Sequence, residues 1–172
     1  MILNLISTYR VVQNMKNILG NMISLITLDI SFETSNVQVM SYMFYNHENL
    51  EYIELSSFKT DNVKYMSYMF YGCKKLLKLE LENFITTDNL IKMDSMFSSC
   101  HNLEKIQMNN FYTNNIQDMS HLFEDWKSSK SIEISDEKFI TSKVTLMNYM
   151  FSNCESLSEI SFKFDTKFDF YL

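Results

Sequence analysis

The chain has 172 residues, a formal net charge of −6, and 46% hydrophobic residues. That hydrophobic content is typical of a folded protein and excludes a largely disordered chain. The negative charge argues against nucleic acid or an anionic membrane surface as the main partner. No run of about 18 apolar residues is free of polar interruption, so the sequence also predicts no membrane span.

One pattern recurs along the whole chain. Its clearest copy runs from Val63 to Phe84 and reads Val-x-x-Met-x-x-Met-Phe-x-x-Cys-x-x-Leu-x-x-Leu-x-Leu-x-x-Phe. The second residue of the Met-Phe step recurs every 25–28 residues, at Leu19, Phe44, Phe70, Phe97, Phe123 and Phe151. A fixed period in this range predicts a stacked solenoid of the leucine-rich-repeat kind.

The repeats can be placed in chain order. Residues 1–11 are predicted to be the tail of a partial repeat, because a shift of 25 residues places Leu3 and Leu5 on Leu28 and Ile30. Six repeats follow, at 12–36, 37–62, 63–89, 90–115, 116–143 and 144–168, and a truncated end occupies 169–172. The sequence thus predicts a single repeat domain over 1–172, which is either a piece of a longer array or has its end turns covered by a partner.

Each repeat combines two periodicities. Val37, Met40, Met43 and Phe44 have the spacing of one face of a short helix. Triplets such as Thr34-Ser35-Asn36 precede that segment and are typical helix starts. The Leu-x-x-Leu-x-Leu segment that follows has a two-residue period and predicts a short strand. The predicted fold class is therefore α/β, a leucine-rich-repeat-like solenoid of about six turns, each with a short parallel strand and a short helix.

The position three residues after each Met-Phe step is a candidate metal site, since Cys and His are zinc ligands. It holds Met22, His47, Cys73, Cys100, Trp126 and Cys154. Equivalent residues of stacked turns form a column, however, so the outer two of three lie about 9–10 Å apart and cannot share one ion. We expect core packing here, with no metal and no cofactor, although a bridge between Cys73 and Cys100 is within geometric reach.

Catalytic motifs are missing from the sequence. The three His residues have no fixed relation to a Ser or Cys nucleophile, and the chain has neither a phosphate-binding Gly loop nor a nucleophile-elbow motif. We therefore expect a protein that is not an enzyme and has no catalytic residues.

The outward-facing strand positions form the first candidate binding surface. Acidic residues recur there at one repeat phase, and adjacent like charges in a sheet are mildly destabilising, so a basic partner or a cation would relieve them. An ordinary solvated face is the alternative. The predicted contact residues, called the strand face below, are Tyr52, Glu54, Lys78, Glu80, Lys105, Gln107 and Glu133.

Tyrosines form the second candidate surface. They fall beside the inward Met positions and are expected to point away from the core, where clustered tyrosines are typical of recognition surfaces. Lateral packing between turns is an equally good interpretation. The members, called the tyrosine patch below, are Tyr42, Tyr45, Tyr68 and Tyr71.

The segments Ser56–Val63 and Met66–Cys73 carry a family resemblance. Their pattern resembles the BspA-like leucine-rich-repeat surface proteins, and more narrowly the mycoplasma-type repeat family of unknown function with about 26 residues per repeat. The resemblance implies a cell-surface or secreted solenoid that binds a protein or extracellular-matrix ligand and has no enzyme activity. No signal peptide or anchor is visible in the chain, so that location rests on the resemblance alone.

Two functional hypotheses follow. The first is a non-catalytic protein-binding or adhesion module that uses the strand face. The second is a structural segment that associates end to end through its end turns and has no ligand of its own.

Overall fold

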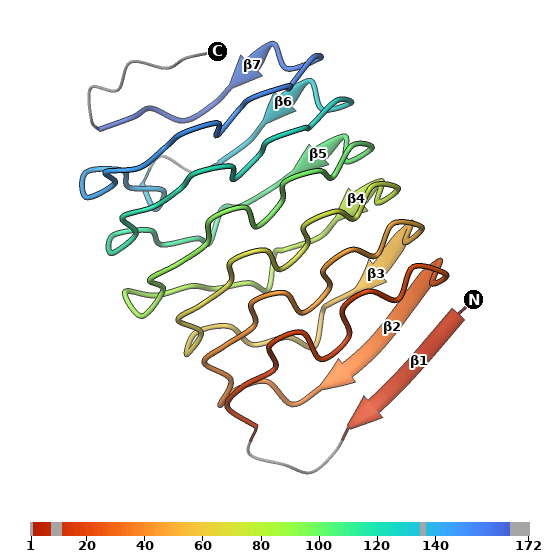
Figure 1. The fold of residues 1–172 in the computed structure, drawn as a ribbon. Helices are drawn as coiled ribbons and strands as arrows, with labels where there is room; N and C mark the ends of the chain where they lie inside the picture. Colours follow the sequence, from red (N-terminus) through yellow and green to blue (C-terminus); the bar gives the residue numbers. More distant parts are fainter. Residues whose placement is uncertain (1, 8–11, 135–136, 166–172) are drawn as a thin grey trace.

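The computed structural model describes residues 2–7, 12–134 and 137–165, as a stack of similar turns that each contribute one short strand (Figure 1). The predicted truncated end at 169–172 lies outside these residues, as do residues 8–11 of the predicted partial repeat. The strands are β1 (Ile2–Ser7), β2 (Thr27–Phe32), β3 (Tyr52–Glu54), β4 (Lys78–Leu79), β5 (Lys105–Ile106), β6 (Ser131–Ile132) and β7 (Glu159–Ile160).

The strands pair in parallel, in the register that the repeat period predicts. In the sheet β1-β2-β3, Leu3 lies opposite Leu28 and Leu5 opposite Ile30. The pairs β4-β5 and β6-β7 continue the stack, again in parallel. A second parallel line of single bridges joins Val39 to Tyr65 and Tyr65 to Lys92. Each turn therefore contacts its neighbours along two lines, which supports the predicted repeat, solenoid-like fold.

The predicted helix is wrong. The described residues contain no helix, and the Met-Phe segment instead forms tight turns. The amide of Met43 donates to the carbonyl of Met40 at 3.2 Å, and the amide of Tyr45 to the carbonyl of Tyr42, also at 3.2 Å. Tyr42 and Asn46 both have a φ of 61°, which no right-handed helix contains. The α/β class is corrected accordingly to strands and turns.

Hydrogen bonds between turns explain why the chain prefers these turns to a helix. The amides of Met40, Tyr42, Phe44 and Asn46 donate to the carbonyls of Tyr65, Ser67, Met69 and Tyr71 at 2.7–3.1 Å. With Tyr42 and Asn46 in the left-handed conformation, every second amide from Met40 to Asn46 points along the stack to a carbonyl of the next repeat. A helix would use the same amides within one turn and would leave the neighbouring turn's carbonyls unpaired, which is costly inside a protein.

The threonines that were predicted to start helices also bond to the next turn. The hydroxyl of Thr34 donates to the carbonyl of Lys59 at 3.0 Å and accepts the amide of Lys59 at 2.7 Å. Thr86, which directly precedes the predicted helix start at Thr87, makes the same two contacts with Tyr112. These threonines are buried, so each holds a corner of one turn against the corner of the next.

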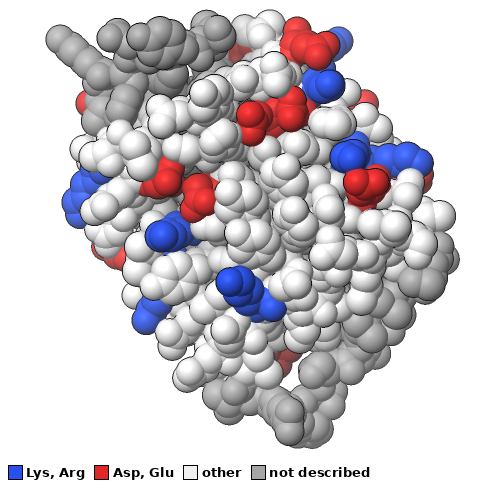
Figure 2. All heavy atoms as spheres, in the orientation of Figure 1, with Lys and Arg blue, Asp and Glu red and all other residues white. Residues whose placement is uncertain are grey.

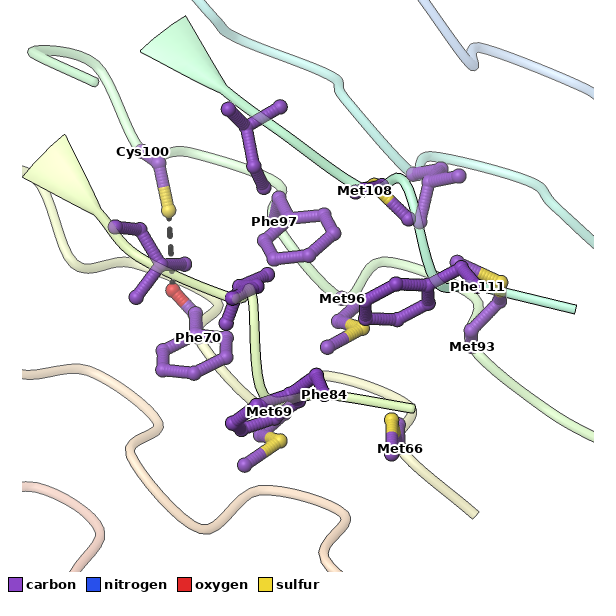
Figure 3. Packing of buried hydrophobic residues seen from close by; sticks show 14 of the residues in the cluster. Met66, Met69, Phe70, Phe84, Met93, Met96, Phe97, Cys100, Met108 and Phe111 are labelled. Carbon is purple, nitrogen blue, oxygen red and sulfur yellow. Dashed lines mark hydrogen bonds between the residues drawn. The ribbon is translucent and has the colours of Figure 1, made fainter. Parts of the chain in front are cut away.

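The core is made of side chains that repeat at the same position in every turn. The Phe rings of the Met-Phe steps stack face to face, with centroids 5.2 Å apart for Phe44 and Phe70 and 5.9 Å apart for Phe70 and Phe97. A parallel line of rings includes Phe84 and Phe111, and inward methionines pack beside the rings of both lines (Figure 3). The core is therefore continuous along the stack, as the repeat predicts.

The candidate metal column is a line of hydrogen-bond donors, called the donor column below. Every member except Met22, whose thioether has no hydrogen to donate, donates from its side chain to the backbone carbonyl of the Phe-position residue one turn earlier; Figure 3 shows this bond for Cys100 and Phe70. The pairs are His47 to Leu19, Cys73 to Phe44, Cys100 to Phe70, Trp126 to Phe97 and Cys154 to Phe123. Cys, His and Trp have little in common except an S–H or N–H donor on an otherwise apolar body, which explains why they share this position.

The cysteines of the donor column are free thiols rather than half of a bridge. Burial raises the pKa of Cys73 to about 12 and that of Cys154 to about 11, and it raises the pKa of Cys100 as well. A protonated thiol can donate a hydrogen bond, whereas a thiolate is what attacks or binds a metal. The column is therefore suited to holding the stack and not to thiol chemistry.

Replacing Ser95 by Gly tests whether the Met-Phe segment forms the observed turn or the predicted helix. Ser95 has a φ of 54°, a conformation that costs a residue with a side chain about 1–2 kcal/mol, whereas Gly loses about 0.5–1 kcal/mol more backbone entropy on folding. We expect Ser95→Gly to raise the free energy of unfolding in urea by about 0.5 kcal/mol, whereas in a helix it would lower it. The control is Ser41→Gly, where φ is not positive and stability should fall.

The burial of His47 in the donor column predicts that the protein loses stability in acid. Burial lowers the pKa of His47, and its Nδ1 is buried without a hydrogen-bond partner. The unfolded chain therefore takes up a proton near the usual histidine pKa of about 6.5, before the folded chain does, so stability falls as the pH drops below about 6.5.

We expect His47→Cys, which places another residue of the donor column there, to remove most of this pH dependence, as measured by urea unfolding between about pH 7 and 5. Burial also lowers the pKa of His101, so His101→Gln serves as the control. A pH dependence that survives in His47→Cys but not in His101→Gln would contradict the assignment.

Candidate functional site

The strand face lies along β3 to β6, and its charges are largely paired within the chain. Lys78 forms an ion pair with Glu80, and the Nζ of Lys105 lies 2.9 Å from Glu133. The hydroxyl of Tyr52 donates to Glu54 at 2.8 Å. The predicted acidic stripe is therefore balanced by neighbours, which reduces the repulsion that a basic partner or a cation would relieve.

The same pairing shifts the pKa values of these groups. The hydrogen bond from Lys105 and then that from Gln107 lower the pKa of Glu133, and the bond to Glu80 raises the pKa of Lys78. A hollow of about 200 Å³ opens beside them, lined by residues 78–82 together with Lys105 and Gln107. The strand face thus presents charge pairs that are already satisfied and that water screens, so each contributes little to attracting a ligand.

The tyrosine patch is a built surface on two neighbouring turns. Tyr42 stacks on Tyr68 with ring centroids 4.8 Å apart and an angle of 4° between the rings, and Tyr45 stacks on Tyr71 at 5.2 Å and 14°. Within each turn the two rings tilt against each other at 5.5 and 5.6 Å. All four are half-buried, so the rings pack between turns, as the second interpretation predicts, and still reach the surface. Recognition through these rings stays a prediction.

A hollow of about 310 Å³ adjoins the patch, and its charged residues were not among those predicted from the sequence. Tyr42, Tyr65 and Tyr68 line it, together with the largely buried Ser41 and Ser67. Lys16, from the turn before, and Lys92, from the turn after Tyr68, also line it, and the Nζ of Lys16 lies 5.5 Å from the centre of the Tyr42 ring. Asp94 is the acidic member, and it accepts a hydrogen bond from Ser67 at 2.6 Å.

The repeat alignment contains the signal that places Lys16 and Lys92 beside the tyrosines. Lys16 occupies the same repeat position as Ser41, Ser67 and Asp94, directly beside the Tyr42 and Tyr68 positions. Lys92 follows Val39 and Tyr65 along the line of bridges. The phase of the tyrosines alone does not reveal these lysines, because they occupy neighbouring repeat positions.

Other kinds of site find little support in the part of the chain that the structure describes. Among those residues, no group of three or more His, Cys, Asp or Glu side chains could hold a metal ion. None of them belongs to a helix long and apolar enough to cross a membrane. Figure 2 shows one face of the molecule, where acidic and basic side chains are scattered among uncharged ones and no large area has a single sign.

Comparison with known proteins gives one family and one fold. Residues 6–105 and 75–168 match the family described as Mycoplasma protein of unknown function, DUF285. None of the curated proteins matches the sequence. The fold is similar to the crystal structure of a leucine rich cell surface protein from Faecalibacterium prausnitzii A2-165, with a TM-score of 0.55 and 18% sequence identity.

That similarity extends over 94% of this chain but only 48% of the other, so the chain spans about half the length of the protein it resembles. At this identity the likeness concerns the fold alone, and it agrees with the stacked parallel turns described above. The two family matches together cover most of the chain and overlap in its middle. The chain therefore belongs to the mycoplasma repeat family of unknown function, DUF285.

Proposed function

We propose that this chain is a non-catalytic binding module of the surface-protein type, which recognises a partner protein through the tyrosine patch. The observation that carries the proposal is the stacking of Tyr42 on Tyr68 and of Tyr45 on Tyr71 at a half-exposed surface. Tyrosine is enriched at protein interfaces because it combines a large apolar ring with a hydrogen-bonding hydroxyl.

The tyrosine patch is a better candidate for the binding site than the strand face because its side chains are already held in place. A side chain that is immobilised only on binding loses about 0.5–1.5 kcal/mol of conformational entropy. The four tyrosines are held by one another and by backbone turns that are hydrogen-bonded to the next turn, so much of that loss has occurred before a partner arrives. The paired charges of the strand face would first have to separate or be buried as pairs.

The lack of enzymatic activity remains part of the proposal. The cysteines of the donor column are protonated and hold backbone carbonyls, which leaves them unsuited to nucleophilic attack. The cell-surface location is likewise proposed from the likeness to a leucine rich cell surface protein. Strand-face contacts and end-to-end association stay as predictions beside it.

Serine substitutions in the patch test the proposal without disturbing the turns. Ser95 occupies the position equivalent to Tyr42 and Tyr68, and Ser98 the position equivalent to Tyr45 and Tyr71, so this fold already accepts serine at both. We expect Tyr42→Ser combined with Tyr68→Ser to weaken binding to a partner protein at least about tenfold, the effect of losing a hot spot. Binding to a panel of purified extracellular-matrix proteins would be measured by biolayer interferometry.

The matched control removes two exposed tyrosines elsewhere, with Tyr112→Ser and Tyr149→Ser, and it should bind like the unmodified chain. Sedimentation velocity on each variant checks that self-association does not produce the signal. Equal binding by the patch variant, together with loss on Lys78→Ser and Lys105→Ser, would transfer the function to the strand face. An unmodified chain that binds no protein of the panel would contradict matrix adhesion.

A further inference from the structure

We infer that the hollow beside the tyrosine patch binds an acidic peptide segment of the partner protein, an inference that rests on the proposed function. The hollow has a volume of about 310 Å³ and contains two lysines and one aspartate. It is thus a locally basic site on a chain whose net charge is −6. Such a local reversal of sign favours an acidic ligand at short range.

The two lysines are available for a ligand. Within the described residues neither Lys16 nor Lys92 belongs to an ion pair, whereas Lys78 and Lys105 of the strand face both do. Lys16 is kept beside the hollow by its position over the Tyr42 ring, a cation–π contact that leaves its ammonium hydrogens free to donate. Asp94 already accepts the hydroxyl of Ser67, which disperses part of its charge.

The geometry of Tyr42 favours a peptide over a nucleic-acid base. Bases bind aromatic side chains through the ring face, but one face of Tyr42 is stacked on Tyr68 at 4.8 Å and Lys16 lies over the ring as well. The ring edge and hydroxyl of Tyr42 remain for the ligand. These suit the side chains and carbonyls of an extended peptide, as in the tyrosine-rich surfaces of antibodies.

Net charge also separates the classes of acidic ligand. A long polyanion such as nucleic acid or a sulfated polysaccharide would bring many charges near a chain of net charge −6, and repulsion would outweigh two lysines. A short segment with two or three carboxylates meets Lys16 and Lys92 without covering the acidic remainder of the surface. The inference therefore concerns short acidic segments and not polyanions.

The test selects ligands from a phage-displayed library of random dodecapeptides, on the immobilised chain. Selected sequences should be enriched in Asp and Glu over the starting library, and synthetic copies labelled with fluorescein should bind in solution by fluorescence polarisation. We expect Lys16→Glu combined with Lys92→Glu to weaken that binding at least about tenfold. Asp94→Asn keeps an acceptor for Ser67 while removing the negative charge, and it should tighten binding about threefold.

The control carries the same change in charge elsewhere, with Lys75→Glu and Lys130→Glu, two exposed lysines outside the hollow. It should bind within about twofold of the unmodified chain, since distant exposed charges are screened. Urea unfolding confirms that every variant is folded. An effect of the control as large as that of Lys16→Glu with Lys92→Glu would mean that only the overall charge matters, and would overturn the site.

The remaining outcomes separate this inference from the proposed function. Peptides that need Tyr42 and Tyr68 but are neither acidic nor sensitive to Lys16→Glu with Lys92→Glu would overturn the acidic ligand and leave the patch as a protein-binding surface. Peptides insensitive to the tyrosines would contradict both, as would the selection of no peptide at all. Heparin that binds more tightly than the selected peptides, and competes with them at the hollow, would replace the peptide by an anionic polysaccharide.

Discussion

The structure depends on one constraint. A turn of about 26 residues without a helix cannot pair all of its backbone amides and carbonyls within itself, so it must form hydrogen bonds with the neighbouring turns. Left-handed residues such as Tyr42 and Asn46 direct alternate amides along the stack, and the next turn supplies the carbonyls. The donor column then pairs buried carbonyls of the Phe positions, and the buried threonines pair the corners. Turns of nearly equal length are required, because an amide can meet its acceptor only at a fixed phase.

The same constraint shapes the surface. Since equivalent residues lie one above the other, two tyrosines at one repeat phase must stack, and two such phases side by side give the four-ring patch. Lys16, one repeat position away in a neighbouring turn, therefore lies at the edge of that patch. Surface features in this fold are therefore made from columns, and substitutions within a column change the surface while leaving the backbone bonds in place.

Much of this was readable from the sequence. The period placed the inward residues, the strand phase and the register, because burial repeats with every turn; Leu3 opposite Leu28 follows from counting alone. The helix prediction failed because tandem turns and one helix face both put Met40, Met43 and Phe44 inward. A missed signal was the recurrence of Asn46, Gly72, Ser99, Asp125 and Asn153 at one phase, since Asn, Asp and Gly are residues that tolerate left-handed φ.

The candidate site was harder to predict. The tyrosines were found by their phase, but the pairing of Lys78 with Glu80 and of Lys105 with Glu133 depends on side-chain conformations that no spacing specifies. The donor role of His47, Cys73 and Trp126 was hidden because each is also apolar enough to belong in a core. Their interchange at one position, with a donor as the shared property, was the available signal.

The bond between neighbouring turns can be observed directly by NMR, through the scalar coupling that a hydrogen bond transmits from amide nitrogen to carbonyl carbon. The amide of Tyr42 lies 3.1 Å from the carbonyl oxygen of Ser67, 25 residues away. We predict a coupling between the Tyr42 nitrogen and the Ser67 carbonyl carbon. A coupling to the carbonyl of Gln38, four residues before Tyr42, would mean that the segment is helical and would contradict the account.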